Sequence, residues 1–275
     1  APHPHIGIQT VSWLVDGEVL HQDTLGIEAM VRPRGVNVMT SGAGIAHAEQ
    51  TPAANRGRLH GVQLWVALPD EHRNVAPSFQ HIDEVPLVGL RGGVAQIFVG
   101  DGSPALRFSE SLGADLEIHR GASVAMPLDA RFEHGFMLLS GDAFIDDQPL
   151  DPDTLYYRAP GAEELRARTI GGARLLIIGG IPFDEPILMW WNFVARTPEE
   201  IARAGEVAGG RFRRGARLRR PADSGAEPFA VGPAESRELT RQGTHGNTCA
   251  SRPPARTSRS APIVAERSIG EAAVS

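Results

Sequence analysis

Four side chains that can bind a metal occur in two short motifs within the first fifty residues. His3 and His5 flank a proline, and His47 and Glu49 flank an alanine. Because successive side chains of a β-strand point to opposite faces, residues i and i+2 share one face. Two such strands that face each other would bring together three imidazoles and one carboxylate. That set fits a divalent transition metal with coordination positions left open.

Each motif has a simpler interpretation when it is taken alone. A His-Pro-His segment near a chain end is commonly a solvated terminus, and an isolated His-x-Glu is commonly a surface pair. A structural zinc site is disfavoured, because such sites are usually closed by four ligands rich in cysteine, and Cys249 is the one cysteine of the chain. The metal hypothesis therefore depends on whether the two motifs meet in the fold.

Composition limits the class of protein. The chain has 275 residues, 41% of them hydrophobic, and a formal net charge of -6 at pH 7. That length suits one large β domain or two smaller ones, and the acidic balance gives no reason to expect direct nucleic-acid binding. All 27 basic residues are arginine, so Schiff-base chemistry by a lysine is excluded. No apolar run approaches the roughly 20 residues that span a bilayer and no signal peptide is visible, so we expect a soluble, cytoplasmic protein.

Short β-rich runs separated by glycine and proline turns predict an all-β sandwich or barrel. The runs predict strands at residues 9–15, 18–21, 36–40, 45–49 and 60–69. The Asp16-Gly17 pair between the first two runs indicates a hairpin. Residues 70–92 have no clear period, and a second β-rich block extends from 95 to about 181.

The second block resembles the first as a weak internal repeat. The positions that correspond to the two N-terminal histidines fall near Asp129 and Arg131, which leaves no His-x-His motif. We therefore expect the second block to pack against the first without binding metal.

The end of the chain changes character twice. Thr197, Pro198 and Glu200 predict a helix start with a capping box. After residue 204 the composition is rich in Arg, Gly, Pro and Ser, which predicts disorder. The basic run at residues 211–220 invites a nucleic-acid or localisation reading, but a solvated charge run is the more common case.

Three sequence blocks together resemble the pirin family of the cupin superfamily. They are the HPH start, MTSGAGIAHAE at residues 39–49 and LHGVQLWVALP at residues 59–69, in the order and spacing of the family. The resemblance extends over about the first 204 residues. It implies an all-β protein of two tandem cupin-type sandwich or barrel domains with a short C-terminal helix.

The resemblance also sets domain limits. We place a metal-binding N-terminal cupin domain, incomplete at its start, at residues 1–92, and a C-terminal cupin-like domain without metal ligands at 93–204. Residues 205–275 form the predicted disordered tail. The residues that precede His-Pro-His in the family are absent, so we expect a truncated first domain with its ligands at an unanchored end. Gln9 stands where many members carry glutamate, and the tail does not resemble the usual C-terminus.

The family's site, carried over by motif, implies one Fe(II) held by His3, His5, His47 and Glu49. Nickel, cobalt, manganese, copper and zinc suit the same donors, because affinity follows the metal series more than the protein. His21 and His60 are candidates to support the ligands or line the cavity, and ordinary hydrogen-bonded barrel histidines are an equally good interpretation.

Two functions use this same site. Some members of the family cleave flavonols such as quercetin with molecular oxygen, and Glu49 would then accept the substrate's hydroxyl proton as the catalytic base. Eukaryotic members are iron-dependent transcription coregulators. The alternative is therefore a redox-responsive regulator that binds a protein partner without turnover.

Overall fold

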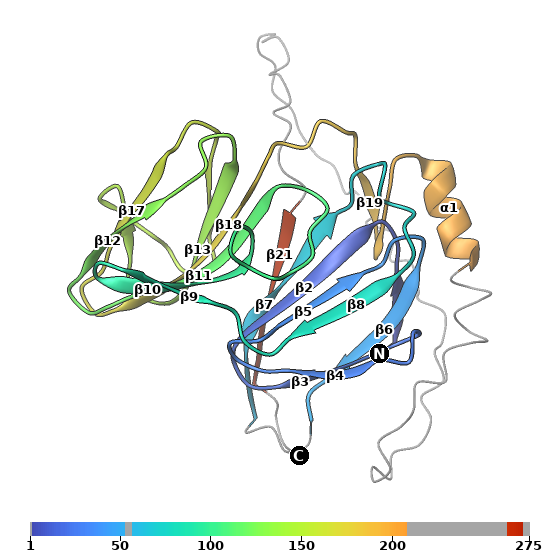
Figure 1. The fold of residues 1–275 in the computed structure, drawn as a ribbon, viewed down its shortest axis with the longest axis horizontal. Helices are drawn as coiled ribbons and strands as arrows, with labels where there is room; N and C mark the ends of the chain where they lie inside the picture. Colours follow the sequence, from blue (N-terminus) through green and yellow to red (C-terminus); the bar gives the residue numbers. More distant parts are fainter. Residues whose placement is uncertain (1, 53–56, 208–262, 272–275) are drawn as a thin grey trace, which may run out of the picture. The chain divides into compact units, whose positions relative to one another are not determined.

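Two antiparallel sheets form the first of two β-barrels (Figure 1), in a computed structural model that describes residues 2–52, 57–207 and 263–271. Sheet I has the strand order β1 (His3–His5), β6 (Ile45–Gln50), β3 (Val19–Asp23) and β4 (Glu28–Val31). Sheet II has the order β21 (Ile263–Glu271), β7 (Arg58–Ala67), β2 (Ile8–Asp16), β5 (Val36–Thr40) and β8 (Ser78–Ile82).

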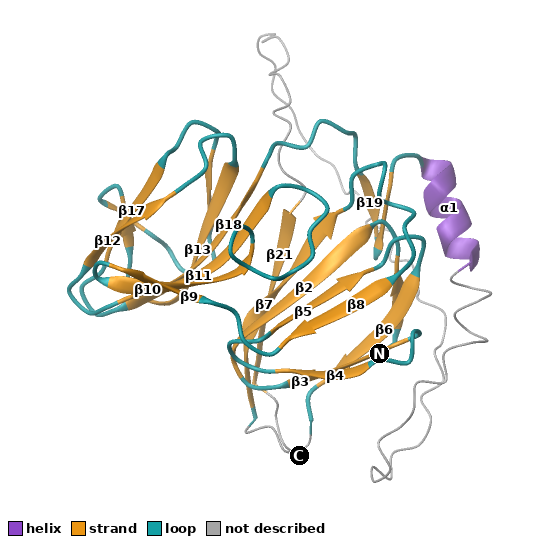
Figure 2. Cartoon of the chain, viewed as in Figure 1, coloured by secondary structure: helices purple, strands orange, loops and turns teal. Residues whose placement is uncertain are grey.

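Two further sheets form the second barrel. Sheet III has the order β16 (Leu155–Arg158), β13 (Glu133–Gly141), β18 (Ala173–Gly180), β11 (Ser111–Ile118), β10 (Gly93–Val99) and β9 (Leu87–Leu90). Sheet IV has the order β12 (Ser123–Pro127), β17 (Glu164–Arg168), β14 (Phe144–Ile145) and β15 (Gln148–Pro149). The described residues are almost entirely strands and turns (Figure 2), and the predicted all-β, two-domain class is confirmed.

The internal repeat is visible in the topology. The order β1-β6-β3-β4 of sheet I recurs position by position as β12-β17-β14-β15 in sheet IV. In the same way, the neighbours β7-β2-β5 of sheet II recur as β18-β13-β16 in sheet III. The strand equivalent to β1 and its two histidines is β12, whose sequence is SVAMP.

An extended apolar core lies between the two barrels. Sheet II contributes Val11, Trp13, Val36, Val38, Val62, Leu64 and Val66, and sheet III contributes Phe98, Val99, Met137, Leu139, Leu176 and Ile178. The second barrel has its own apolar interior, in which Leu116, Phe136 and Leu165 are buried. The corresponding cluster in the first barrel is small and consists of Ile8, Ala67 and Val194 with two half-buried neighbours.

Trp13 joins the two barrels at the centre of this core. Its ring is fully buried and stacks on Phe98, with the ring centroids 4.9 Å apart. Its Nε1–H donates to Oδ2 of the buried Asp115 at 2.7 Å. Arg174 Nε donates to both oxygens of the same carboxylate, at 2.7 and 2.9 Å, so the buried charge is paired as a buried charge must be.

The turn at Asp16-Gly17 is not the predicted hairpin. β2 pairs with β5 and β7, whereas β3 pairs with β4 and β6. A register shift between Leu14 and Asp16 in the β2–β7 pairing and a φ of 89° at Gly17 mark the place where the chain leaves sheet II for sheet I. A strand that bends at a bulge can cross from one sheet to the next, which a local turn signal does not distinguish from a hairpin.

Residues 70–92, which lack a sequence period, nevertheless contain β8 and β9. Both are outermost strands, of sheet II and sheet III respectively, and most of their residues are exposed or half-buried. Edge strands need no continuous apolar face, and this is why the hydrophobic pattern did not reveal them.

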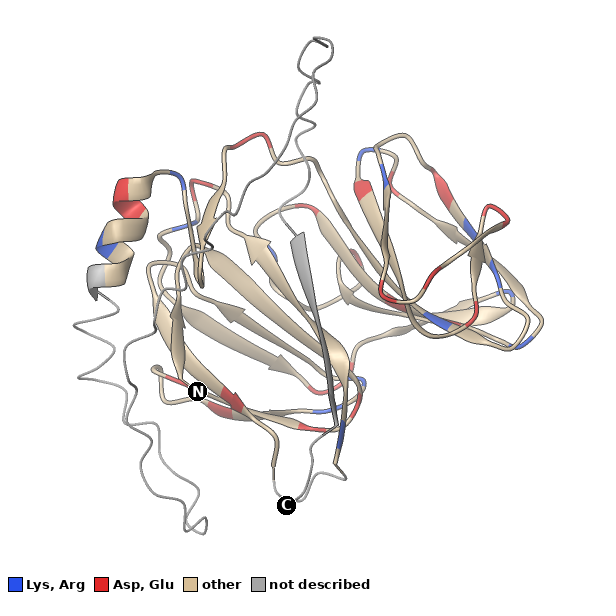
Figure 3. Ribbon diagram, turned by 180° about the vertical axis from the view of Figure 1, so that it is seen from behind, with Lys and Arg blue, Asp and Glu red and all other residues tan. Residues whose placement is uncertain are grey.

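The chain returns to the first barrel after the second one. β19 (Leu188–Trp190) and β20 (Phe193–Ala195) form a hairpin, and the Val194 N–H donates to the Ile6 carbonyl at 3.2 Å. Helix α1 (Pro198–Val207) follows, with the acidic residues Glu199 and Glu200 in its first turn (Figure 3). No helix among the described residues is long and apolar enough to cross a membrane.

The predicted capping box of α1 is present. The Glu200 N–H donates to Thr197 Oγ1 at 3.3 Å, and the Thr197 N–H donates back to Glu200 Oε2 at 3.4 Å. Glu200 also accepts from Arg73 at 2.9 Å, and the guanidinium of Arg73 is the first cause that lowers the pKa of Glu200 to about 2. These contacts hold the helix against the first barrel, although the sequence assigned it to the end of the second.

Within the predicted disordered tail, Ile263–Glu271 forms β21 and pairs with β7 over its whole length. This strand was missed, because its partner is an edge about two hundred residues away in sequence, and unpaired strand edges accept an added strand. The basic run at 211–220 and Cys249 lie outside the described residues.

We expect Trp13→Phe to lower the free energy of unfolding by about 2 kcal/mol, because it removes a buried hydrogen bond to a charged acceptor and part of a packed ring. Trp190→Phe is the matched control, since Trp190 is 57% exposed, and should change the free energy by less than about 0.5 kcal/mol. Urea unfolding of both variants measures the difference. Equal values for the two would contradict the role given to Trp13.

Candidate metal centre

The inner face of sheet I carries six polar groups that can bind a metal or support one. β1 contributes His3 and His5, β6 contributes His47 and Glu49, and β3 contributes His21 and Asp23. The strand register places His3 and Asp23 on either side of His47, and His21 opposite Glu49. Because directly opposed residues of an antiparallel pair point to the same face, all six side chains face the barrel interior.

Glycines make the corners through which both ligand strands enter. Gly7 lies between β1 and β2 with φ 69°, and Gly42 lies between β5 and β6 with φ 48°. A Cβ on Gly7 would lie 2.2 Å from the Val194 carbonyl oxygen, and one on Gly42 would lie 2.0 Å from that of Val75. The two corners are joined by a hydrogen bond from the Gly7 N–H to the Gly42 carbonyl at 3.0 Å. Gly42 thus lies in a sharp bend that a larger residue could not adopt without strain.

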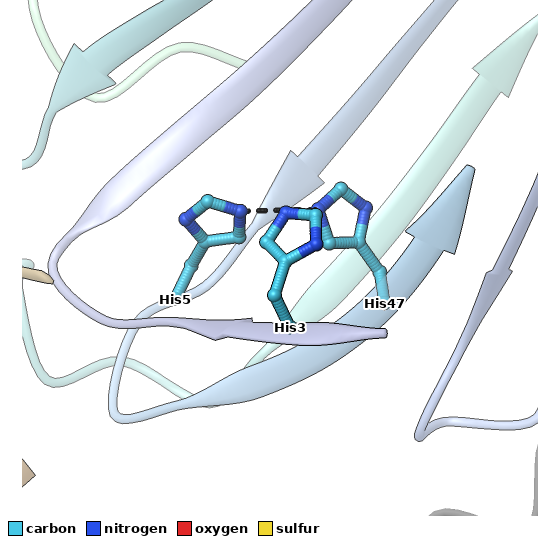
Figure 4. A group of neighbouring side chains, drawn as sticks. All are labelled: His3, His5 and His47. Atoms are coloured by element: carbon cyan, nitrogen blue, oxygen red, sulfur yellow. Dashed lines mark hydrogen bonds between the residues drawn. The ribbon is translucent and has the colours of Figure 1, made fainter. Parts of the chain in front are cut away.

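Three of the four predicted ligands meet in the barrel (Figure 4). The Nε2 atom of His47 lies 3.0 Å from Nε2 of His5 and 3.0 Å from Nε2 of His3. Two nitrogens bound at right angles, each about 2.1 Å from one metal ion, would be about 3.0 Å apart. The spacing of the imidazoles therefore fits a single transition-metal ion.

Burial keeps two of these rings neutral. Desolvation, followed by the charge of His3, lowers the pKa of His5 to about 3. Desolvation, followed by the neighbouring imidazoles of His5, His3 and His21, lowers the pKa of His47 to about 2. A metal ligand must be unprotonated, so both rings are ready to bind at neutral pH.

A distant backbone group orients His5. Its Nδ1 lies 3.2 Å from the carbonyl oxygen of Asn192 in the turn between β19 and β20. A carbonyl can only accept, so Nδ1 carries the proton and the Nε2 lone pair faces the other two imidazoles. The ring edge also packs on Trp65, with the centroids 5.0 Å apart.

Glu49 lies beside the imidazole cluster rather than within it. Its carboxylate joins His21 and His47 in a second group of possible ligand atoms, all within 4.8 Å of one another, which shares only His47 with the first group. Gln63 Nε2 donates to both of its oxygens, at 2.9 and 2.8 Å, and Ser12 Oγ donates to Oε1 at 3.2 Å. Its assignment as a fourth ligand stays a prediction.

Ser12 and Gln63, which contact Glu49, were not predicted from the sequence. One feature of the sequence could have indicated these two residues. They are polar residues in β2 and β7 that alternate with the apolar Val11, Trp13 and Leu64, which face the second barrel. Trp65 Nε1 donates to Gln63 Oε1 at 3.2 Å, which fixes the amide so that its Nε2 faces Glu49.

The other two candidates are placed differently. His21 is buried at 2% exposure, close to His47. His60 lies in β7 opposite Asp16 and belongs to neither group of possible ligands. Gln9 faces away from the site, because its Nε2 donates to Thr40 Oγ1 at 3.0 Å and to the Leu106 carbonyl at 3.2 Å.

A pair of β-barrels with three convergent imidazoles in the first defines the two-domain cupin class. Sequence profiles narrow the class further: that of Pirin matches residues 1–66, and that of the Pirin C-terminal cupin domain matches residues 113–212. The chain therefore belongs to the pirin family, as its motifs predict.

Individual relatives agree with this assignment. The chain is 41% identical over 207 residues to a Pseudomonas aeruginosa protein named "Putative quercetin 2,3-dioxygenase PA1205", covering 74% of this chain and 65% of that protein's length. It is 32% identical to a Pirin-like protein of Caulobacter vibrioides, over 74% of this chain and 73% of the relative. A crystal structure of quercetin 2,3-dioxygenase from Acinetobacter baumannii superimposes with a TM-score of 0.75 and 38% identity, covering 86% of this chain and 80% of that one.

We expect the metal-free protein to lose stability as the pH falls below 6.5, the ordinary pKa of both His5 and His47. In the unfolded chain these rings take up protons near that pH, whereas in the fold they stay neutral down to about 3 and about 2. The unfolded state thus binds more protons in this window, and the free energy of unfolding decreases with falling pH.

Urea unfolding of the metal-free protein between about pH 7.5 and about pH 4.5 measures this slope. The double variant His5→Asn with His47→Asn removes both groups and should have a flatter profile. Identical slopes for the variant and the parent would contradict the lowered pKa values of His5 and His47 in the fold.

Proposed function

We propose that the chain is a metal-dependent oxygenase that cleaves flavonol-type substrates with O2, in the manner of quercetin 2,3-dioxygenases. The observation that carries the proposal is the convergence of three imidazole Nε2 atoms at 3.0 Å spacings, with a half-buried carboxylate beside them. The names of the relatives support the substrate class, and the chain spans only part of their length.

His3, His5 and His47 would hold the metal, and Fe(II) is the ion we propose. Nickel, cobalt, manganese, copper and zinc are the alternatives, because a set of imidazoles does not discriminate strongly among them. When bound, the metal supplies a Lewis acid that polarises a substrate oxygen and lowers the pKa of its hydroxyl group.

Glu49 is the proposed general base. Its carboxylate is next to His47, and the fixed amide of Gln63 aims it into the barrel. A carboxylate in that place can accept the proton of the flavonol 3-hydroxyl as the substrate binds. Before the substrate binds, Ser12 and Gln63 hold the carboxylate by hydrogen bonds, which limits its motion and favours a single position.

We expect purified wild-type protein to contain a stoichiometric transition metal and His47→Ala to contain almost none, because Nε2 of His47 is the atom shared by both contacts of the cluster. His119→Ala is the matched control, since His119 is exposed in the second barrel, and should keep the metal. Elemental analysis gives the ion and its amount. A wild-type protein that stays metal-free after incubation with Fe(II) would overturn the proposed site.

Glu49→Gln should lower kcat/KM for O2 uptake with quercetin at least about 100-fold, because an amide cannot accept the hydroxyl proton. Glu71→Gln, at a carboxylate with 77% side-chain exposure, is the matched control and should retain activity. An oxygen electrode measures the rate, with metal content determined on the same samples. Metal-loaded wild-type protein that consumes no oxygen with quercetin would overturn the proposed activity while leaving the metal site in place.

A further inference from the structure

Two buried side chains stand in line behind His47, on the side opposite the imidazole cluster. Nδ1 of His47 lies 3.5 Å from Nδ1 of His21, and Nε2 of His21 lies 3.1 Å from Oδ2 of Asp23. The side chain of Asp23 is fully buried, and that of His21 is 2% exposed. The series runs from Asp23 through His21 to His47, whose other nitrogen faces His3 and His5.

The direction of the hydrogen bonds follows from the Asp23 end. Oδ1 of Asp23 accepts from the backbone N–H groups of Leu25 and Ile27, at 2.8 and 3.2 Å. Oδ2 is therefore the oxygen presented to His21, and a carboxylate can only accept, so Nε2 of His21 carries the proton. A neutral imidazole that is protonated at one nitrogen has a lone pair on the other, and this lone pair faces Nδ1 of His47.

We propose that Asp23 and His21 are positioning residues that set the tautomer of His47. His47 donates its Nδ1–H to His21, which leaves the Nε2 lone pair directed at the metal position. A metal-ligating histidine almost always donates its second nitrogen to a fixed acceptor, which fixes the ring and raises its basicity. The proposal depends on the metal site proposed above, but the tautomer itself is a property of the metal-free protein.

The geometry also fixes how the ring of His21 is held. It stacks on Phe79, with centroids 4.4 Å apart and an angle of 20° between the planes. β3 pairs with β6 so that Asp23 lies opposite His47 and His21 lies opposite Glu49. His21 therefore cannot turn without losing both the ring contact and the carboxylate.

A second metal ion held by His21, His47 and Glu49 is the competing interpretation of the same atoms. We call the series of hydrogen bonds from Asp23 through His21 to His47 the relay. The contacts of Glu49 favour the relay over a second metal ion, because both oxygens of Glu49 already accept from Gln63. The two interpretations differ in the number of metal ions. The relay predicts one zinc ion per chain, whereas a second ion that shares His47 with the first predicts two.

Asp23→Asn tests the proposal with little change of shape. The amide oxygen must stay on the N–H groups of Leu25 and Ile27, so the NH2 group takes the place of Oδ2 and donates to His21. His21 is then protonated on Nδ1, two donors face each other, and His47 is driven to the tautomer with its proton on Nε2. We expect Zn(II) to bind about 10- to 100-fold more weakly.

The chain supplies a matched control in another His-x-Asp pair of the first barrel. Nε2 of His81 lies 3.1 Å from Oδ1 of Asp83, whose side chain is 98% exposed. Asp83→Asn makes the same chemical change outside the proposed relay and should leave Zn(II) affinity unchanged. Competition with a chelator measures the affinity of all three proteins, and circular dichroism checks that they are folded.

Nitrogen-15 NMR of labelled histidines in the metal-free protein reads the tautomer directly, with His47→Ala used for assignment. We expect Nδ1–H at His47 in the wild type and in Asp83→Asn, and Nε2–H in Asp23→Asn. Nε2–H in the wild type, equal Zn(II) affinity of Asp23→Asn and wild type, or two zinc ions per chain would each overturn the relay. A wild type that binds no zinc but shows the Nδ1–H tautomer would instead count against the proposed metal site alone.

Discussion

Sheet II packs its outer face against sheet III, and the rest of the structure depends on this contact. Imidazoles, carboxylates and amides occupy much of the interior of the first barrel, so it has little apolar surface to bury there. The apolar side chains of β2 and β7 face outward instead, onto the second barrel. Burial of apolar surface is the main favourable term in folding, so the second barrel supplies the apolar contacts that the interior of the first barrel lacks.

The two barrels divide these tasks on one topology. Sheet I of the first barrel and sheet IV of the second have the same strand order. The interior of the second barrel, however, is filled with Leu116, Phe136, Leu165 and other apolar side chains. An interior packed in this way is rigid and close to the density of a crystal. This interior supports sheet III, on which Trp13 packs. The buried carboxylate of Asp115, paired with the half-buried Arg174, accepts from Trp13 and fixes one lateral position for that contact.

Much of the site could be predicted from sequence because it is local. The i, i+2 spacing of His3 with His5 and of His47 with Glu49 fixes which side chains share a face, and the family motifs gave the pairing. The parts that could not be predicted involve partners distant in sequence. Nothing near His5 points to the carbonyl of Asn192, and nothing near Glu49 points to Gln63.

The wrong or missing predictions of strands and turns have the same origin, namely partners that are distant in sequence. The Asp16-Gly17 turn has the residues of a hairpin, but the sheet to which β3 belongs is decided by β6, more than twenty residues later. β8 and β9 are edge strands with weak hydrophobic patterns. β21 pairs with β7, and nothing in the sequence of β21 indicates this partner. His21 was identified as a possible supporting residue, yet its role depends on Asp23, a carboxylate that reads as an ordinary turn residue.

The contact between His5 and Asn192 spans 187 positions of the chain. Closing a loop of that size is slow and costs entropy that only later contacts recover. During synthesis, His5 leaves the ribosome before Asn192, and the carbonyl that orients its ring is made 187 residues later. The imidazole cluster therefore takes its final geometry late, after the second barrel has been made and the β19–β20 hairpin has reached the first barrel.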